Sequence, residues 1–100
     1  MTTSEYEAYV KMRCQPYTDP NYCVVALNEE AGEIAGWWKK YQLRGNLKGL
    51  LSTKDLMSEL GDVLFYLTRL ASHYGWTLED IMLFNKAKLD ERTGKSMIVG

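Results

Sequence analysis

Acidic residues fall at helical spacing in two stretches of the chain, residues 27–38 and residues 56–66. The five acids are Glu29, Glu30, Glu33, Glu59 and Asp62. Residues three apart in an α-helix lie on the same side, so each stretch presents a pair of carboxylates together. Oxygen ligands without histidine or cysteine are those that hard cations such as Mg²⁺ and Mn²⁺ prefer. The two stretches therefore predict one divalent-metal site.

The two stretches repeat each other at a fixed offset along the chain. The matching pairs are Leu27 with Leu56, Glu30 with Glu59, Gly32 with Gly61, Glu33 with Asp62, Ile34 with Val63, and Trp37 with Tyr66. A single pair of acids at this spacing is more often a solvated helix face. Two matching pairs beside matching apolar positions are hard to obtain by chance. We therefore expect one half-site to occur twice, with its four acids converging in one cleft.

Helical angles place most of these acids at the edge of an apolar stripe. Measured from Leu27, Glu30 lies about 60° and Glu33 about 120° to one side, whereas Glu29 lies about 160° away and points out of the cleft. The expected core stripe of the first stretch is Val24, Leu27, Ala31, Ile34, Trp38 and Tyr41. The stripe of the second stretch is Leu56, Leu60, Val63, Leu67, Leu70 and Tyr74. Packing these stripes together predicts the convergence of the acids.

Helix start and stop signals divide the chain. Asp19 before Pro20 and Thr77 with Asp80 are N-caps, and Gly75 and Gly94 are stops. The predicted helices are 4–14, 20–43 (ending near Gly45), 53–74 (capped by Ser52 or Thr53) and 78–92, with loops at 15–19 and 44–51 and a tail at 95–100. No stretch alternates with a period of two residues, so the fold class is all-α. We expect a four-helix-bundle type of long antiparallel helices, completed by oligomerisation.

Composition narrows the class of protein. The chain of 100 residues fits one domain, residues 1–100, and 46% of its residues are hydrophobic, enough for a core. Its net charge of −1 gives no electrostatic case for binding a nucleic acid polymer or a membrane. Cys14 and Cys23 match no metal spacing and are expected to be free thiols. Without a signal peptide or a membrane-spanning apolar run, a cytoplasmic location is expected.

The last helix carries polar groups where an apolar stripe would continue. Ile81, Asn85, Lys88 and Arg92 lie within about 60° of one another. Arg92 could hold two phosphate oxygens, Lys88 could act as a point charge, and Asn85 could reach a sugar hydroxyl or a base edge. Viewed alone, the same residues could be a solvated basic face. Trp37 and Tyr66, beside the acids, could stack on a nucleobase or be ordinary core aromatics.

These motifs occur in the order found in one known family. Residues 29–33, EEAGE, followed by residues 59–62, ELGD, resemble the EExxE…ExxD signature of MazG-like nucleotide pyrophosphohydrolases, in the all-α NTP pyrophosphatase superfamily. Residues 85–92, NKAKLDER, resemble the downstream NxxKLxxR element. The resemblance covers about residues 24–95. One acid motif alone would be weak evidence, but all three in order are specific.

The resemblance implies an activity and roles for the residues. It implies Mg²⁺-dependent cleavage of a nucleoside triphosphate, often a deoxynucleotide, between its α and β phosphates, in nucleotide-pool house-cleaning. The implied metal ligands are Glu30, Glu33, Glu59 and Asp62. Glu29 would help to hold the metal site or the attacking water. Lys88 and Arg92 would bind phosphates, and Asn85 and Tyr66 the nucleoside.

Two other functions fit the same residues. One is a non-catalytic helical module that binds a metal or a nucleotide, and the other is a pyrophosphohydrolase of a phosphoribosyl intermediate. In all cases the third predicted helix is apolar on nearly every side, so it must be buried on every side. We therefore expect a homodimer or homotetramer with this helix in the interface and with active sites that draw residues from two chains.

Overall fold

The computed structural model describes residues 1–14, 19–43 and 53–94, and these residues form helices and no strand. The elements are α1 (Thr3–Arg13), α2 (Pro20–Trp38), the π-helix η1 (Lys39–Leu43), α3 (Thr53–His73) and α4 (Leu78–Thr93). The all-α prediction is confirmed. The loop predicted at 44–51, most of the loop at 15–19, the proposed stop at Gly45, the cap at Ser52 and the tail lie outside the described residues.

Local capping signals fix the helix ends. The Asp19 carboxylate accepts a hydrogen bond from the Asn21 N–H at 2.9 Å, and Pro20 occupies the first position of α2. Gly75 and Gly94 have φ angles of 75° and 66°, left-handed values that glycine adopts most easily. These bounds agree with the predicted ones to within about two residues, as expected for signals that act within one turn.

The second helix departs from prediction at its end, where the expected α-helix becomes the π-helix η1. Tyr41 of η1 stacks on Trp37, with ring centroids 4.7 Å apart and an interplanar angle of 13°. The wider turn of the π-helix accompanies this stacking. The prediction of a continuous α-helix to Leu43 is therefore wrong for its last turn.

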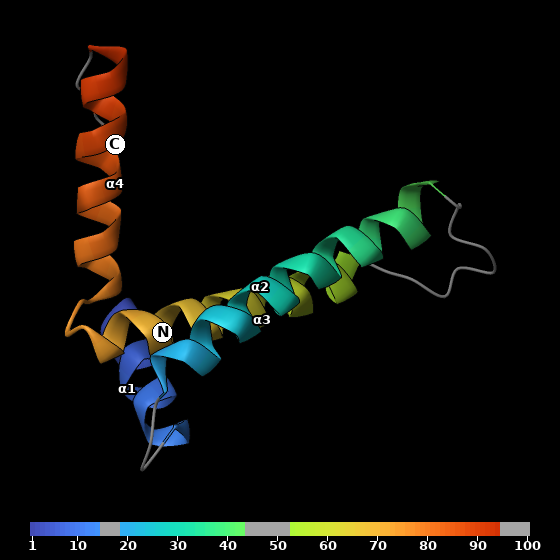
Figure 1. Cartoon of the computed structure of the whole chain (residues 1–100), viewed down its shortest axis with the longest axis horizontal. Coiled ribbons are helices and arrows are strands. Elements are labelled where there is room, and N and C mark those ends of the chain that lie inside the picture. Colours follow the sequence, from blue (N-terminus) through green and yellow to red (C-terminus); the bar gives the residue numbers. More distant parts are fainter. Residues whose placement is uncertain (15–18, 44–52, 95–100) are drawn as a thin grey trace.

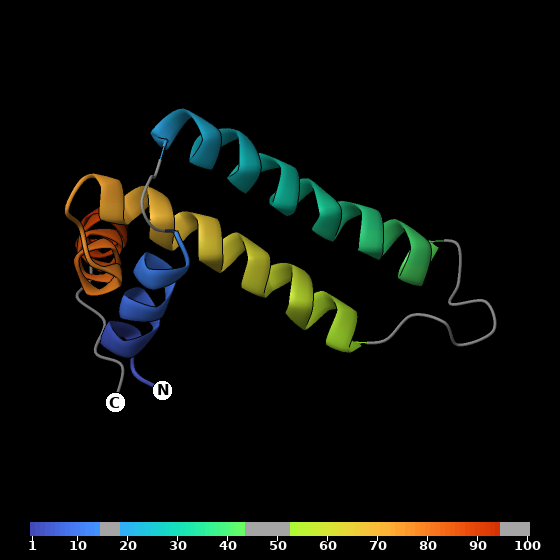
Figure 2. The same cartoon turned by 90° about the horizontal axis from the view of Figure 1, so that it is seen from below.

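α2 and α3 lie side by side and antiparallel, and they form the long arm of the molecule (Figure 1 and Figure 2). α1 packs against the end of α3 and the start of α4. Most of the buried residues lie on α1, the start of α2, the end of α3 and the start of α4, and they are Val10, Cys23, Thr68, Ala71 and Leu78. Trp37, which is also buried, lies near the other end of α2. The core thus lies at one end of the arm, and most of the α2–α3 pair extends beyond it.

α2 is rotated about its axis relative to the predicted stripe. Trp37 is 8% exposed, whereas Trp38, which was predicted in the core, is 52% exposed, and Val24 is exposed as well. Cys23, Glu30 and Trp37 recur every seven residues, and all three are buried or half-buried. Because α2 is apolar on several sides, the stripe alone did not determine which side faces α3. The observed rotation brings Glu30 toward the seam between the helices.

α4 turns away from the α2–α3 pair, so one chain does not place four helices side by side (Figure 1). The radius of gyration is 16.6 Å, where a compact domain of this length has about 13 Å. Among the described residues, no helix has both the length and the hydropathy needed to cross a membrane. One chain therefore does not form the predicted four-helix bundle, and such a bundle would need a second copy of the chain.

Candidate active site

The five predicted acids gather where α2 and α3 run past each other. Carboxylate oxygens of Glu29, Glu30 and Glu33 lie within 4.8 Å of one another, and those of Glu30, Glu59 and Asp62 do the same. Glu30 belongs to both groups and joins them into one cluster. The antiparallel pairing explains this, because it places the acid pair of one half-site opposite the acid pair of the other, with Glu33 beside Glu59.

The electrostatics of the cluster suit a bound cation. Burial, then the charges of neighbouring acids led by Glu33, raises the pKa of Glu30. Burial, a hydrogen bond with Glu33 and the nearby carboxylates raise the pKa of Glu59. The Oε2 atom of Glu59 is buried and has no hydrogen-bond partner. Repelling carboxylates with an unsatisfied buried oxygen fit an oxygen-liganded divalent ion, which would neutralise them.

Glu29 is placed differently from its predicted position. The helical angle put it on the far side of α2, yet its carboxylate reaches within 4.8 Å of Glu30 and Glu33. The side chain is exposed and long enough to cross the shoulder of the helix. The prediction that Glu29 points away from the cluster is therefore wrong, because backbone angle alone ignores the reach of a flexible side chain.

Aromatic rings and one cation continue the seam beyond the acids. Tyr66 lies near Tyr22, with ring centroids 6.1 Å apart, and makes an edge contact with Phe65 at 5.3 Å. The Arg69 guanidinium lies 5.6 Å from the centre of the Tyr66 ring. Sequence reasoning missed Tyr22 and Arg69. The spacing contained a signal for Arg69, since residues 59, 62, 66 and 69 share one face of a helix.

Trp37, the other aromatic residue predicted beside the acids, is buried and stacks on Tyr41. Its indole Nε1 has no hydrogen-bond partner. One face of the ring is thus already covered within the chain. Its predicted role in stacking on a base stays a prediction.

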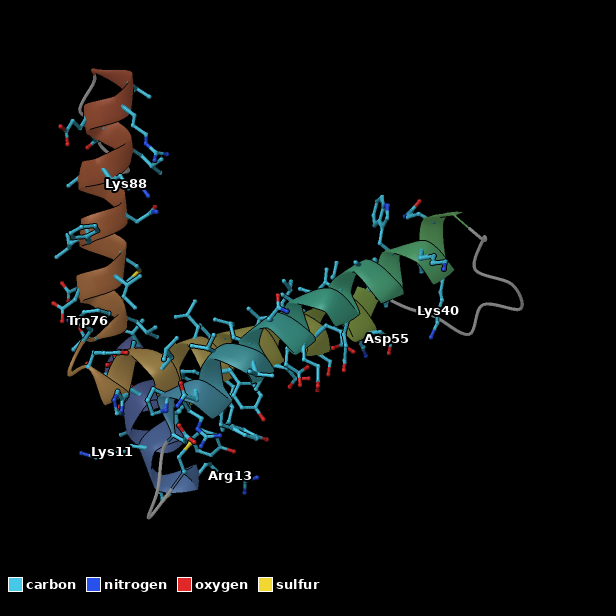
Figure 3. All side chains as sticks on the ribbon, viewed as in Figure 1. Lys11, Arg13, Lys40, Asp55, Trp76 and Lys88 are labelled. Atoms are coloured by element: carbon cyan, nitrogen blue, oxygen red, sulfur yellow. The ribbon has the colours of Figure 1, made fainter. Side chains whose placement is uncertain are left out.

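The predicted phosphate and nucleoside residues of α4 lie apart from the acids of the same chain. Lys88 projects from α4, far from the α2–α3 pair (Figure 3). Asn85 and Lys88 line a separate hollow of about 400 Å³ at the foot of α4, together with Trp76, Asp80, Ile81 and Phe84. Arg92 is exposed in the last turn of α4. One chain therefore brings together the acids and Tyr66 but not Asn85, Lys88 and Arg92.

Duplicated acid pairs on an antiparallel pair of helices define a class of all-helical protein whose carboxylates could hold a divalent cation. Comparison with known proteins identifies the class. Residues 19–96 match the model of the MazG nucleotide pyrophosphohydrolase domain. The chain therefore belongs to the MazG family, and the resemblance seen in its motifs is confirmed.

One relative is similar to this chain over most of its length but adds no function. The chain is 32% identical over 90 residues to the gene 37 protein of Mycobacterium phage L5, covering 87% of this chain and 77% of that protein. The name of that phage protein states no activity. No solved structure matches the chain significantly.

Proposed function

We propose that this protein is a Mg²⁺-dependent nucleoside triphosphate pyrophosphohydrolase, with Mn²⁺ as a substitute metal. It cleaves a ribo- or deoxyribonucleoside triphosphate between the α and β phosphates and releases the monophosphate and pyrophosphate. The observation that carries the proposal is the cluster of five carboxylates joined through Glu30, with its buried unpartnered oxygen on Glu59. Family membership supports the reaction class.

The acids between α2 and α3 have different proposed roles in the reaction. Glu30, Glu33, Glu59 and Asp62 would hold the metal, and Glu29, exposed at the edge of the cluster, would accept a proton from the attacking water. A bound divalent ion supplies polarisation of the phosphoryl oxygens and a lower pKa for water. The water oxygen bonds to the α phosphorus as the bond to the bridging oxygen of the β phosphate breaks. No covalent intermediate with the protein is required.

The active form in this proposal is at least a homodimer with α3 in the interface. Met57, Leu60 and Leu64 follow one stripe of α3 at spacings of three and four residues, and all three are exposed. Leu64 also lines an apolar groove of about 510 Å³ together with residues of α1 and α4. The chain exposes 7975 Å², where a compact monomer of its mass exposes about 5,800 Å². An excess of this size is what an obligate homodimer would bury.

Assembly also offers a way to complete the site. In the proposed dimer, α4 of one chain presents Asn85, Lys88 and Arg92 to the acids of the other. Exposed apolar side chains on α4 support a partner there, because Met82, Leu83 and Phe84 are consecutive and span about 200° of the helix. No single neighbouring helix of the same chain could cover such a span.

A panel of ribo- and deoxyribonucleoside triphosphates tests the proposal directly, with pyrophosphate release measured in Mg²⁺, in Mn²⁺ and after chelation. We expect metal-dependent release from at least one nucleotide. Tight binding with no release from any nucleotide would instead support the non-catalytic module, and release only from a phosphoribosyl substrate would support the other enzyme.

A further inference from the structure

Arg69 occupies an unusual place on α3. Its guanidinium lies 5.7 Å from the ring centre of Tyr22, 5.8 Å from that of Phe65 and 5.6 Å from that of Tyr66. Cation–π contacts of this length hold a guanidinium in place without neutralising its charge. The rings therefore fix the orientation of a cation and leave its charge available.

Among the described residues, no carboxylate forms an ion pair with Arg69. Lys86 and Asp90 of α4 pair with each other. Residues 15–18, 44–52 and 95–100, which lie outside the described ranges, contain no Asp or Glu. The Nε atom of Arg69 is buried and has no hydrogen-bond partner. A guanidinium has five N–H donors and loses free energy when a buried donor is left unpaired. Arg69 is thus a cation that aromatic rings hold in place, and its Nε atom has no hydrogen-bond acceptor.

Arg69 and the acid cluster belong to one continuous face of α3. Glu59, Asp62, Tyr66 and Arg69 are spaced by three, four and three residues, which keeps them on one side of the helix. Asp62 and Arg69 are two turns apart, about 10 Å along the axis. Tyr66 lies between them along this face, and the Arg69 guanidinium is 5.6 Å from the centre of its ring. A ligand that leaves the acid cluster along α3 meets Arg69 next.

We propose that Arg69 is a phosphate-binding residue that holds the terminal phosphate of the substrate while the acid cluster holds the phosphates at the cleaved bond. This inference rests on the proposed function and adds a contact within one chain that the α4 cations do not provide. A guanidinium pairs with two oxygens of one phosphate at once. The rings of Tyr22, Phe65 and Tyr66 keep the guanidinium oriented for that pairing. Arg69 then selects triphosphates over the monophosphate product, which has no terminal phosphate to offer.

The test is to compare Arg69→Gln and Arg69→Lys with wild type, using Arg13→Gln as the matched control. Arg13 is exposed on α1 and belongs to no part of the site. Calorimetry at fixed Mg²⁺ would measure binding of inorganic pyrophosphate, inorganic tripolyphosphate and a nucleoside monophosphate, and steady-state kinetics would give KM for the best triphosphate. We expect Arg69→Gln to weaken tripolyphosphate binding and raise KM by about tenfold or more, with monophosphate binding unchanged. Arg69→Lys should lose less, because it keeps the charge but not the fork.

Other results would overturn the proposal. Equal losses for monophosphate and tripolyphosphate would show that Arg69 serves the nucleoside or the fold. A lower melting temperature in both variants with unchanged affinities would show that the ring contacts are structural only. If Arg69→Gln fails to fold, the affinities of Arg69→Lys decide. A further outcome is that wild type hydrolyses no nucleotide while the Arg69 variants still bind tripolyphosphate more weakly than wild type does. In that case the proposed function fails and the phosphate subsite stands.

Discussion

The α2–α3 pair and α4 differ in how far one chain completes them. The pair brings its five acids into two groups of three that share Glu30, and an aromatic and cationic cluster lies beside them. α4 carries the other predicted site residues, yet Phe84 on the same helix is 76% exposed and Lys88 projects away from the pair (Figure 3). The repeated acid motifs suffice to build the site in the α2–α3 pair, whereas the site residues of α4 have no partner helix within the described part of the same chain.

This difference separates two kinds of information in the sequence. The acids are positioned by two helices that contact each other along their length, so their geometry needs only one chain. The cations of α4 can reach a phosphate only if something else brings α4 and the acids together. The predictions below test each region and the contact proposed between them.

The largest effect is expected in the α2–α3 pair. Glu59→Gln should lower turnover by at least about 100-fold, since even residues that merely support a metal ligand contribute 10–100-fold. Thermal melting should be unchanged or higher, because one repelling carboxylate is removed. Pyrophosphate release at limiting Mg²⁺ measures the loss, with Glu91→Gln on α4 as the matched control. Near-normal turnover in Glu59→Gln would remove this residue from the metal site.

The next largest effect is expected at the proposed dimer interface on α3, which would bring α4 of one chain to the acids of the other. Leu60→Asp should weaken self-association by about 100-fold or more, because a carboxylate buried in an apolar contact loses its hydration without gaining a partner. Light scattering at micromolar concentration should then show a chain of 11.5 kDa in place of a dimer or tetramer. Met12→Asp changes another exposed apolar side chain, on α1, and should leave assembly intact. A wild-type protein that is folded, active and monomeric would contradict the shared-site proposal.

A smaller effect is expected at the tip of α4. Arg92→Ala should lower kcat/KM by about tenfold or more, since one charged bidentate donor is worth about 1.5–3 kcal/mol. Arg13→Ala is the control for loss of a surface arginine. Unchanged kinetics in Arg92→Ala would show that this helix face is only solvated.

Mixing the two impaired variants, Arg92→Ala and Glu59→Gln, reveals which chain supplies Arg92. If the acids of one chain work with α4 of the other, mixed dimers of Arg92→Ala and Glu59→Gln contain one intact site each. Random exchange of subunits should then restore about a quarter of the wild-type activity. No recovery after exchange would place Arg92 and the acids of one chain in the same site.

What the sequence predicted well depends on local structure. Helix ends followed from caps such as Asp19 and Thr77, which act within one turn. The convergence of Glu30, Glu33, Glu59 and Asp62 followed from a repeat that two antiparallel helices bring face to face. Both predictions needed only helical geometry and one pairing.

What the sequence did not predict depends on tertiary contacts. Trp37 is buried and Trp38 is exposed because of the rotation of α2 against α3. The sequence does not determine this rotation, because α2 is apolar on several sides. The contact of Glu29 with the cluster depends on side-chain reach. Arg69 was missed because its partners include Tyr22, which lies 47 residues earlier in the chain. The direction of α4 follows from a turn and a few contacts that no helical period encodes.

The smallest expected effect concerns the cap that starts α4. The Asp80 carboxylate accepts a hydrogen bond from the Thr77 N–H at 2.9 Å, and the Asp80 N–H donates to the Thr77 hydroxyl at 3.0 Å. The bonds from Thr77 lower the pKa of Asp80 below its ordinary value. A carboxyl with a lowered pKa in the folded state stabilises the fold above its unfolded pKa and loses that contribution as the pH falls through the folded value.

Asp80→Asn should therefore be less stable than wild type near neutral pH, and the difference should shrink as the pH falls below about 4. Thermal melting of both proteins from about pH 3 to about pH 7 measures this convergence. Glu79→Gln removes a neighbouring acid of the same turn that takes no part in the cap, so it should cost less at neutral pH. A difference for Asp80→Asn that stays constant across this range would show that charge does not contribute to the cap. In that case α4 would take its direction from the packing of Leu78 against α1, and contacts with a second chain would have to hold the rest of the helix.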